Sequence, residues 1–398
     1  MSGYRYLSSL EKFGINLGLE RITCLLEQLK NPHEQFKSIH IAGTNGKGST
    51  AAMAASILKE AGYKVGLYTS PHLFDYTERI KINGKDISRK DFAEGLRLIE
   101  KISSNPRLPP KADPPREEKC GVANLSPTVF EVLTALAFRY FAQKKVDYAV
   151  VEVGLGGRLD ATNVLIPEVS VITNIDLEHT EILGKTLAKI SAEKAAIIKP
   201  GVPVVTAEHK QEALKVIKKI GKNNSSLSIL VTRYPLSVTG KLLGAHQKLN
   251  AACAVAAIRL ARIKVSRSAI KNGLRKTAWP GRFQIISKKP LIIVDGAHNP
   301  AGVKSLRVTI REQFPDKFTV IFGCQKTKDF KKMLREIKPV AARLIITQSS
   351  HLQAADLKFG AVRTNSIKEA IARWDGKSPL LVTGSLFLVA DAMNLLSA

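Results

Sequence analysis

Short, almost entirely apolar segments alternate along this chain with longer stretches that carry apolar residues at helical spacing. In the first part of the chain the apolar segments fall at 36–43, 64–70, 146–154 and 168–175, and helical stretches run from Lys47 to about residue 61 and over 127–141. Near-continuous apolar strands are typical of parallel sheets that helices cover on both faces. The pattern therefore predicts an α/β protein.

The alternation is interrupted once and then begins again. Four helices are expected at 186–199, 210–221, 245–262 and 266–276, and the Pro280-Gly281 pair then breaks the pattern. Strands are expected again at 290–296, 318–323, 342–348 and 379–384, with helices between them. A chain of 398 residues is long enough for two or three domains of roughly 150 residues. We predict two doubly wound domains, 1–278 and 284–398, joined by a linker at 279–283.

Residues 103–127 contain six prolines. Proline has no backbone N–H and does not sustain a helix or a central strand. We interpret this stretch as a surface loop, and a partner-binding extended segment is the less favoured alternative.

The net charge and the cysteines indicate which class of partner the chain binds and in which compartment it is expected. The chain has 61 Lys and Arg against 34 Asp and Glu, a net charge of +27, which suggests a polyanionic partner or simply a basic surface. Its four cysteines are scattered without a C-x-x-C pair, which argues against a zinc site or a disulfide framework and favours a reducing compartment. The N-terminus lacks an apolar signal region and no apolar run reaches 18 residues, so the expected location is cytoplasmic, with no membrane partner.

The segment from Ile39 to Thr50 is the most informative one for function. A strand is followed by a Gly-rich turn and then by a small-residue helix, so backbone N–H groups and the helix N-terminus are placed to bind phosphate. Lys47 can reach the β- and γ-phosphates, and Ser49 can place a hydroxyl on Mg²⁺. The usual Walker A spacing is not met, because Ile41 occupies the first glycine position and Gly48 separates Lys47 from Ser49. A structural Gly-rich turn is the alternative.

This loop resembles that of the Mur ligase superfamily, and further motifs are similar to folylpolyglutamate synthase/dihydrofolate synthase. The matching segments occur in family order over nearly the whole chain, at 16–21, 68–73, 152–163, 246–251, 295–300 and 383–385. The resemblance implies an N-terminal P-loop ATPase domain of the Mur ligase type and a smaller Rossmann-like C-terminal domain. It also implies an ATP-dependent ligase that uses Mg²⁺.

The resemblance assigns the ATP and metal sites residue by residue. ATP is expected to contact Thr44, Asn45, Gly46, Lys47, Gly48, Ser49, Thr50, Asn250, Arg282, Asp295 and His298. Ser49, Glu152 and His179 are expected to bind Mg²⁺. Glu152 ends a predicted strand, where ligands bind in open α/β sheets. His179 taken alone would be a loop or capping histidine.

Four residues are expected to be catalytic: Lys47, His179, Lys194 and Arg282. The resemblance implies that Lys194 is carbamylated, which would replace a cation by an anion beside the metal, whereas from the sequence alone it is a solvated helix lysine. Arg282, just after the linker, can reach the γ-phosphate as a guanidinium clamp.

The resemblance also implies a folate site. Its expected residues are Gly18, Leu19, Glu20, Ser70, His72, Thr128, Phe130, Glu131, Leu159, Asp160 and Ala161. Phe130 offers a stacking face for the pterin, although as a plain helix residue it would belong to the core. One departure concerns the segment after the strand at 318–323, where the family often has Asp-Lys-Asp and this chain has Thr327-Lys328-Asp329.

These observations lead to one principal function and two rivals. The expected reaction joins L-glutamate to tetrahydrofolate or a folylpolyglutamate through an acyl phosphate, and dihydropteroate is a second expected substrate. A Mur-type ligase acting on cell-wall nucleotide-peptides is the near rival. A nucleic-acid-binding ATPase is the distant one, and it is disfavoured because aromatic residues make up only 6% of the chain. We expect a monomer with no nucleic-acid partner.

Overall fold

A computed structural model of the chain describes residues 2–104, 126–224, 228–230, 240–351, 354–356 and 362–396. The chain divides into two compact units, Met1–Val238 with Leu249–Lys276, and Thr239–Lys248 with Thr277–Ala398. Helix α9 (Ala245–Leu260) begins in the second unit and ends in the first.

The first unit is built on a sheet that has eight strands within the described residues, in the order β4-β3-β2-β5-β1-β6-β7-β8. The strands from β2 to β8 in this order are parallel, whereas β3 and β4 pair in antiparallel fashion at one edge. Their bounds are β1 (Lys37–Ala42), β2 (Val65–Tyr68), β3 (Ile80–Ile82), β4 (Lys85–Asp86), β5 (Tyr148–Glu152), β6 (Val169–Ile172), β7 (Val204–Thr206) and β8 (Ser228–Leu230).

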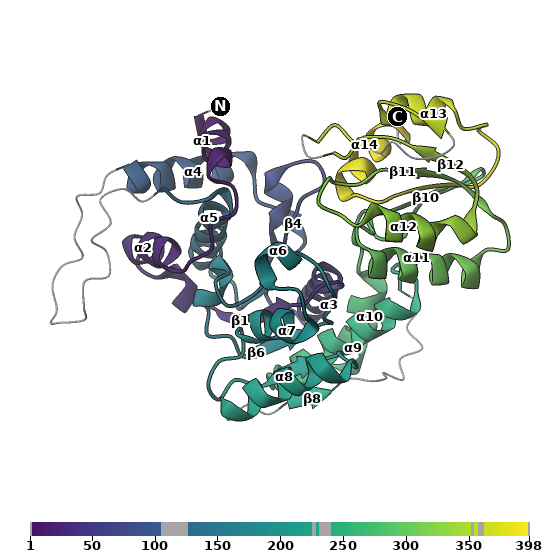
Figure 1. Ribbon diagram of the computed structural model, residues 1–398. Helices are drawn as coiled ribbons and strands as arrows, with labels where there is room; N and C mark the ends of the chain where they lie inside the picture. The colour runs from purple at the N-terminus through teal and green to yellow at the C-terminus, as the bar shows by residue number, and fades with distance from the viewer. Residues whose placement is uncertain are drawn as a thin grey trace, which may run out of the picture. The chain divides into compact units, whose positions relative to one another are not determined.

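Helices cover both faces of this sheet. On one face α1 (Ser2–Leu10), α2 (Glu20–Gln28), α4 (Arg89–Ser104) and α5 (Val129–Gln143) enclose a core that includes Tyr68 and Val151. On the other face α3 (Lys47–Glu60) and α10 (Arg267–Lys276) lie side by side, and the Ser56 hydroxyl donates to the Gly273 carbonyl at 2.8 Å (Figure 1). Further along, α7 (Leu187–Ala195) and α8 (Gln211–Asn223) pack on β6 and β7, and α6 (Thr180–Leu183) precedes them. This double cover explains why β1 is buried from Ser38 onward.

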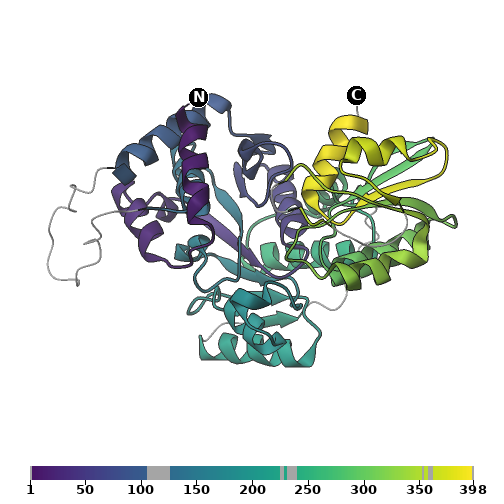
Figure 2. The same cartoon turned by 45° about the horizontal axis from the view of Figure 1, so that its top comes forward.

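The second unit repeats the three-layer arrangement on a smaller sheet. Its order within the described residues is β13-β12-β11-β14-β10-β9, parallel except for β9 against β10. Helices α11 and α12 cover one face, and α13 and α14 cover the other (Figures 1 and 2). The bounds are β9 (Gln284–Lys288), β10 (Leu291–Asp295), α11 (Pro300–Gln313), β11 (Phe318–Phe322), α12 (Phe330–Ile337), β12 (Ala341–Ile346), β13 (Val362–Arg363), α13 (Ile367–Ala372), β14 (Leu380–Thr383) and α14 (Leu386–Leu396).

The predicted α/β class with two wound sheets is confirmed, and two details differ. The antiparallel strands β3, β4 and β9 were not predicted, because they are short and partly exposed and therefore lack a continuous apolar run. The loop expected at 103–127 does not begin at residue 103, since Ser103 and Ser104 end α4. The remainder of that loop up to residue 125 lies outside the described residues.

The scattered cysteines argued against a disulfide framework, but Cys24 is disulfide-bonded, a bond that the spacing did not predict. Cys253 and Cys324 are buried and free, and Cys120 lies outside the described residues. A disulfide requires two Cα atoms within about 7 Å, a tertiary condition that spacing along the chain does not reveal.

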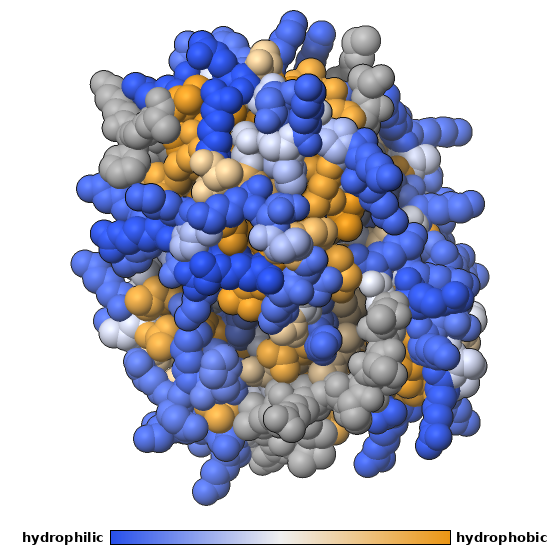
Figure 3. Space-filling view, turned by 90° about the vertical axis from the view of Figure 1, so that its right-hand side faces the viewer, coloured by the Kyte–Doolittle hydropathy of each residue, from blue (hydrophilic) through white to orange (hydrophobic). Residues whose placement is uncertain are grey.

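The surface of the molecule is mainly hydrophilic on the face viewed in Figure 3. Figure 3 shows one face of the molecule, on which hydrophilic side chains predominate and apolar side chains form smaller patches between them. Among the described helices, none combines the length and the apolar character that a membrane crossing requires.

Candidate active site

The predicted phosphate loop connects β1 directly to α3, and the segment after β6 holds it in place. The Thr44 N–H donates to the Asn174 carbonyl and the Asn45 N–H to the Asn174 Oδ1, both at 2.8 Å. The Asp176 N–H donates to the Thr44 hydroxyl oxygen at 2.9 Å. The shape of the loop therefore depends on residues that lie about 130 positions away in the sequence.

Gly46 marks the point where the loop becomes helix. Its φ of +84° lies in the left-handed region, and a Cβ added there would lie 2.3 Å from the Asn250 Oδ1. Asn250 is buried on α9, so this predicted ATP residue lies directly against the loop. The first N–H groups of a helix lack intrahelical acceptors, and at α3 they follow immediately after Gly46. This is the arrangement that binds phosphate oxygens in other α/β proteins.

Two lysines share one carbonyl of the loop. The Lys47 Nζ donates to the Gly43 and Thr44 carbonyls at 3.0 and 3.2 Å. The Lys194 Nζ, from α7, donates to the same Gly43 carbonyl at 2.9 Å. Burial, and secondarily the charge of Lys47, lower the pKa of Lys194 to about 7. From the sequence alone Lys194 read as a solvated lysine, and the structure shows that it is 5% exposed.

The three predicted metal ligands belong to the carboxyl ends of strands in the first sheet. Glu152 is the last residue of β5, Ser49 comes after β1 and its loop, and His179 comes after β6. The register places Ile41 of β1 opposite Glu152 of β5 and Val171 of β6, so these parallel strands end together. Glu152 is buried and accepts the Ser70 N–H at 3.2 Å, and Ser49 is buried in the first turn of α3. His179 is exposed and precedes α6 with a φ of +51°.

A pocket of about 260 Å³ lies beyond the carboxyl ends of β2 and β5. It is lined by eight of the predicted folate residues: Gly18, Ser70, Thr128, Phe130, Glu131, Leu159, Asp160 and Ala161. A Cβ added at Gly154 would lie 2.4 Å from the Phe130 Cζ, so the Phe130 ring packs closely against the backbone of the pocket wall. Phe130 also packs against the first-unit core, as its helical position suggested.

The other three predicted folate residues do not line this pocket. Leu19 packs against the core of the first unit, and Glu20 is the first residue of α2. His72 accepts a hydrogen bond from the Arg79 Nε at 2.9 Å, and its ring centroid lies 4.4 Å from that of Tyr76. His72 therefore contacts Arg79, which does line the pocket.

A network of polar side chains holds the N-terminus of α5 beside the pocket. Thr128 and Glu131 form a capping box, in which the Thr128 N–H donates to Glu131 at 2.7 Å. The Arg21 guanidinium from α2 reaches the same carboxylate with the Nε at 3.1 Å and an Nη at 3.0 Å. Arg21 thus neutralises a buried charge at the pocket.

Asp160 holds the segment that forms another wall of the pocket. Its Oδ2 accepts the Leu155 N–H at 2.8 Å, and its Oδ1 accepts the Thr162 N–H at 3.0 Å. Burial raises the pKa of Asp160 above its usual range, and these hydrogen bonds oppose that increase.

Several lining residues were not predicted. They are Gly14, Ile15, Asn16, Leu17, Pro71, Arg79, Gly154 and Leu155. Most of them lie next to or within motifs that the sequence does show, so the neighbourhood was identifiable. Arg79 lies 9 positions beyond Ser70 and returns to the pocket only through the fold.

In the second unit, the predicted residues Arg282, Asp295 and His298 lie together at the end of β10. Asp295 accepts the Phe283 N–H at 2.7 Å and the Ala297 N–H at 2.8 Å. His246 lies near them: burial lowers its pKa, while the charge of Asp295 acts to raise it and the charge of Arg282 acts to lower it. His298 lies in the same turn, with its Nδ1 2.9 Å from the Gly296 carbonyl oxygen.

The departure at Thr327 falls on an exposed position. Two residues later Asp329 caps α12 by accepting the Lys332 N–H at 3.1 Å. The aspartate that this chain retains therefore has a structural use.

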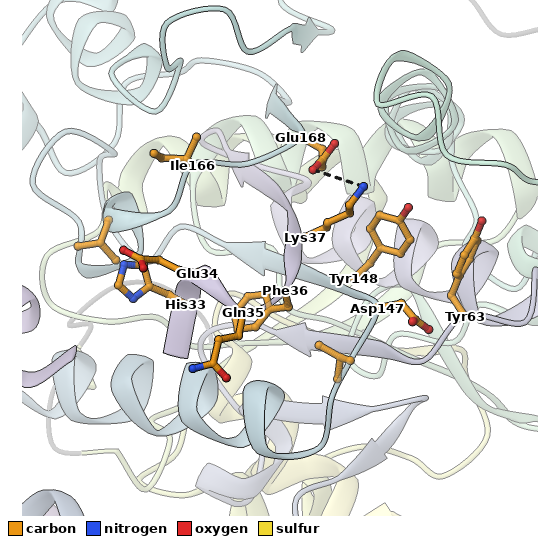
Figure 4. A pocket seen from close by; sticks show the side chains of 12 residues that line it. His33, Glu34, Gln35, Phe36, Lys37, Tyr63, Asp147, Tyr148, Ile166 and Glu168 are labelled. Carbon is orange, nitrogen blue, oxygen red and sulfur yellow. Dashed lines mark ion pairs between the residues drawn. The ribbon is translucent and has the colours of Figure 1, made fainter. Parts of the chain in front are cut away.

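A larger cavity, of about 680 Å³, lies at the opposite edge of the first sheet, where β1 and β5 begin (Figure 4). Its lining includes Lys37, Asp147, Tyr148, Glu168 and the exposed Ile166, and Lys37 and Glu168 form an ion pair at 3.9 Å. None of the predicted site residues lines it. Because open α/β sheets bind ligands at the carboxyl ends of their strands, the smaller pocket is the candidate site.

Comparisons with known proteins show which family this chain is similar to. Residues 281–386 match the Mur ligase glutamate ligase domain. The dihydrofolate synthase/folylpolyglutamate synthase of Bacillus subtilis (strain 168) is 33% identical over 421 residues, covering 96% of this chain and 95% of that protein.

Solved structures give the same result. Folylpolyglutamate synthase from Thermotoga maritima is 35% identical, with a TM-score of 0.83, over 100% of this chain and 98% of that chain. E. coli FolC in complex with DHPP and ADP is 30% identical, with a TM-score of 0.83, over 99% of this chain and 97% of that chain. Similarity of this extent, over the whole length of the relatives, shows that the chain belongs to the folylpolyglutamate synthase/dihydrofolate synthase family of Mur ligases.

Proposed function

We propose that this protein is an ATP-dependent ligase that joins L-glutamate to a reduced folate or folylpolyglutamate. The observation that carries the proposal is that the proposed ATP site and the proposed folate site both lie at the carboxyl ends of strands of one sheet. Strand β1 ends in the phosphate loop, while β2 and β5 end at the pocket lined by Phe130 and Asp160. A ligase needs the nucleotide and the carboxylate substrate side by side, and the carboxyl edge of a parallel sheet provides that arrangement.

The reaction has two steps. The γ-carboxylate of the folate attacks the γ-phosphorus of ATP, the bond to the β-phosphate oxygen breaks, and ADP leaves. The α-amine of L-glutamate then attacks the acyl carbon, phosphate leaves with the electrons of the carbon–oxygen bond, and the amine loses a proton. Lys47 and the N–H groups at the start of α3 stabilise the charge on the transferring phosphoryl group.

The residues at the sheet edge fit Mg²⁺ as the metal partner of ATP. Ser49 offers a hydroxyl oxygen, Glu152 a buried carboxylate, and His179 an imidazole. The described residues contain no group of three His, Cys, Asp or Glu side chains that could hold a metal ion. Mg²⁺ is usually held by one or two protein groups together with substrate phosphates, and the Ser49 hydroxyl and the Glu152 carboxylate are oxygen ligands of that kind. When bound, the ion supplies neutralisation of phosphate charge.

We further propose that Lys194 is carbamylated. Its neutral amine attacks the carbon of CO₂, a carbon–nitrogen bond forms, and a proton leaves to solvent. The lowered pKa supports this step, since only the neutral amine reacts. The product is an anion beside the Gly43 carbonyl in place of a second cation beside Lys47.

The second unit is proposed to supply the remaining ATP contacts. Arg282 would act on the γ-phosphate as a guanidinium clamp, and Asp295 and His298 would bind nucleotide or substrate. The match of 281–386 to a glutamate ligase domain supports this division of roles. We propose that the functional domains are 1–278 and 284–398, with a linker at 279–283.

In the first unit, the pteridine ring of the folate is proposed to bind in the pocket against Phe130. Gly18, Ser70, Thr128, Glu131, Leu159, Asp160 and Ala161 would form its walls. The other three predicted folate residues do not line the pocket and would support the residues that do; they are Leu19, Glu20 and His72. Since the E. coli relative was solved with DHPP and ADP, dihydropteroate is the proposed second substrate.

One assay separates this proposal from its rivals. Purified protein with ATP and Mg²⁺ is incubated with tetrahydrofolate plus L-glutamate, dihydropteroate plus L-glutamate, a cell-wall nucleotide-peptide plus an amino acid, or single-stranded nucleic acid. We expect ADP release that requires both glutamate and a pteroate, and products heavier than the substrate by one glutamyl residue or more. ADP release with the cell-wall precursor or with nucleic acid alone would contradict it.

A further inference from the structure

A buried chain of hydrogen bonds connects the strand of the phosphate loop to the wall of the folate pocket. His40 lies on β1, three residues before Gly43, and is 0% exposed. Its Nε2 lies 2.8 Å from the Thr162 Oγ1, and that hydroxyl donates to the Asp160 Oδ1 at 2.5 Å. Thr162 is likewise 0% exposed and Asp160 is 2% exposed, so water does not compete for these contacts.

The direction of each hydrogen bond follows from the acceptors. The Asp160 Oδ1 already accepts the Thr162 backbone N–H at 3.0 Å, so this oxygen is an acceptor and the Thr162 hydroxyl must donate to it. A hydroxyl has one proton, and its oxygen is then free to accept. His40 must therefore carry its proton on Nε2 and donate it to Thr162. Its Nδ1 is buried with no hydrogen-bond partner among the described residues.

The carboxylate at the end of this chain fastens both ends of one pocket segment. Its Oδ2 accepts the Leu155 N–H and its Oδ1 accepts the Thr162 N–H, so the segment from 155 to 162 is closed on itself by a single side chain. Leu155, Leu159, Asp160 and Ala161 of this segment line the pocket. The orientation of one carboxylate thus sets the position of a whole wall.

We infer that His40 is a positioning residue for folate binding, acting through Thr162 to orient Asp160 and the pocket wall that it closes. The inference rests on the proposed function, because folate is taken as the ligand of the pocket. His40 itself does not line the pocket, so its effect on a ligand there has to pass through Thr162 and Asp160. It acts as a fixed donor that removes the rotational freedom of the Thr162 hydroxyl and so of the carboxylate.

Burial explains why the imidazole of His40 stays neutral. The His40 pKa is lowered to about 3, first by burial and then by the positive charge of Lys199. A neutral imidazole with its proton on Nε2 is a donor of fixed direction across the physiological pH range.

The inference is tested with matched variants on the full-length protein. His40→Met and Thr162→Val remove the donor and the relay while keeping volume, and His40→Gln and Thr162→Ser retain a donor or a hydroxyl. Ser170→Ala is the control, because Ser170 pairs with His40 across β1 and β6, is 0% exposed, and bonds to the Ile197 carbonyl instead. Binding of dihydropteroate and of ADP is measured by calorimetry, and KM and kcat are measured for tetrahydrofolate.

We expect His40→Met and Thr162→Val each to raise the dihydropteroate Kd and the tetrahydrofolate KM by roughly tenfold, the value of one lost hydrogen bond. The ADP Kd and kcat should change by less than about twofold, because the hydrogen bonds of these two side chains lead to the pocket wall and not to the phosphate loop. The double variant should be no worse than Thr162→Val, because both act on one chain. His40→Gln and Thr162→Ser should recover most of the affinity.

Imidazole nitrogen NMR provides a readout that needs no substrate. The His40 signals should show a proton on Nε2 in the wild type and a changed Nε2 shift in Thr162→Val. A proton on Nδ1, an equal rise in the ADP Kd, or the same losses in Ser170→Ala would overturn the inference. If the wild type releases no ADP with any pteroate and glutamate, the proposed function has failed. If the wild type is active and the variants match it, the inference alone has failed.

Discussion

At the scale of single residues, Lys194 combines deep burial with a contact to the phosphate loop. Its Nζ donates to the Gly43 carbonyl at 2.9 Å, and burial lowers its pKa to about 7 from the ordinary 10.5. We expect Lys194→Ala to fold normally and to lower kcat by roughly 10²-fold or more, as loss of a preorganised charge does elsewhere. Small carboxylic acids should restore part of the activity by occupying the vacated anionic position.

Carbamylation also predicts a pH dependence. Because the neutral amine reacts, the carbamate content at fixed dissolved CO₂ should fall as the pH falls through about 7. Carbon-13 NMR with labelled CO₂ measures it directly. Lys199→Met is the control, since burial lowers the pKa of Lys199 too, while its Nζ donates to the Asn163 carbonyl, away from the loop. A carbamate signal that survives in Lys194→Ala would contradict the assignment.

Gly46 allows a second residue-scale prediction. Gly46 and Gly62 have similar φ values of +84° and +92°, but a Cβ at Gly46 would lie 2.3 Å from Asn250, whereas nothing lies within 4 Å of one at Gly62. Both Ala variants should lose about 1–2 kcal/mol of stability from the left-handed backbone. Gly46→Ala should in addition raise the ADP Kd more than tenfold, roughly 1.4 kcal/mol or more. Equal ADP affinity in the two variants would show that the Asn250 contact does not shape the loop.

At the scale of elements, the start of α5 belongs both to the fold and to the site. Thr128 caps α5 and lines the pocket, while Ser366 caps α13 in the second unit in a similar way, accepting the Glu369 N–H at 3.3 Å. Thr128→Ala and Ser366→Ala should each cost about 1 kcal/mol of stability. Thr128→Ala alone should also raise the KM for tetrahydrofolate. Scanning calorimetry and steady-state kinetics measure the two effects, and a normal KM in Thr128→Ala would remove this helix terminus from the proposed folate site.

At the scale of the whole molecule, the net charge of +27 should affect how fast anionic substrates are captured. We expect kcat/KM for a folylpolyglutamate to fall as salt rises, because the Debye length shrinks from ~30 Å at 0.01 M to ~8 Å at 0.15 M. Dihydropteroate has one carboxylate and should show a weaker dependence than the polyglutamate. Equal salt slopes for the two substrates would exclude a steering role for the charge.

The sequence by itself determined the α/β class, the strand–loop–helix at 39–50 and the family resemblance, because each of these depends on local chemistry. Apolar runs of strand length reveal a doubly covered sheet, and glycines next to a lysine reveal a phosphate loop. The short strands β3, β4 and β9 were not predicted, because a short and partly exposed strand leaves no such apolar run.

Only the tertiary structure decided which distant groups meet and what their environment does to them. Lys194 reaches Gly43 across 151 positions, His40 reaches Thr162 across 122, and Arg21 reaches Glu131 across 110. A lysine is solvated or neutral, and a histidine is a ligand or a fixed donor, according to its burial and its neighbours. Burial arises when several strands and helices pack together, so no local stretch of sequence contains it.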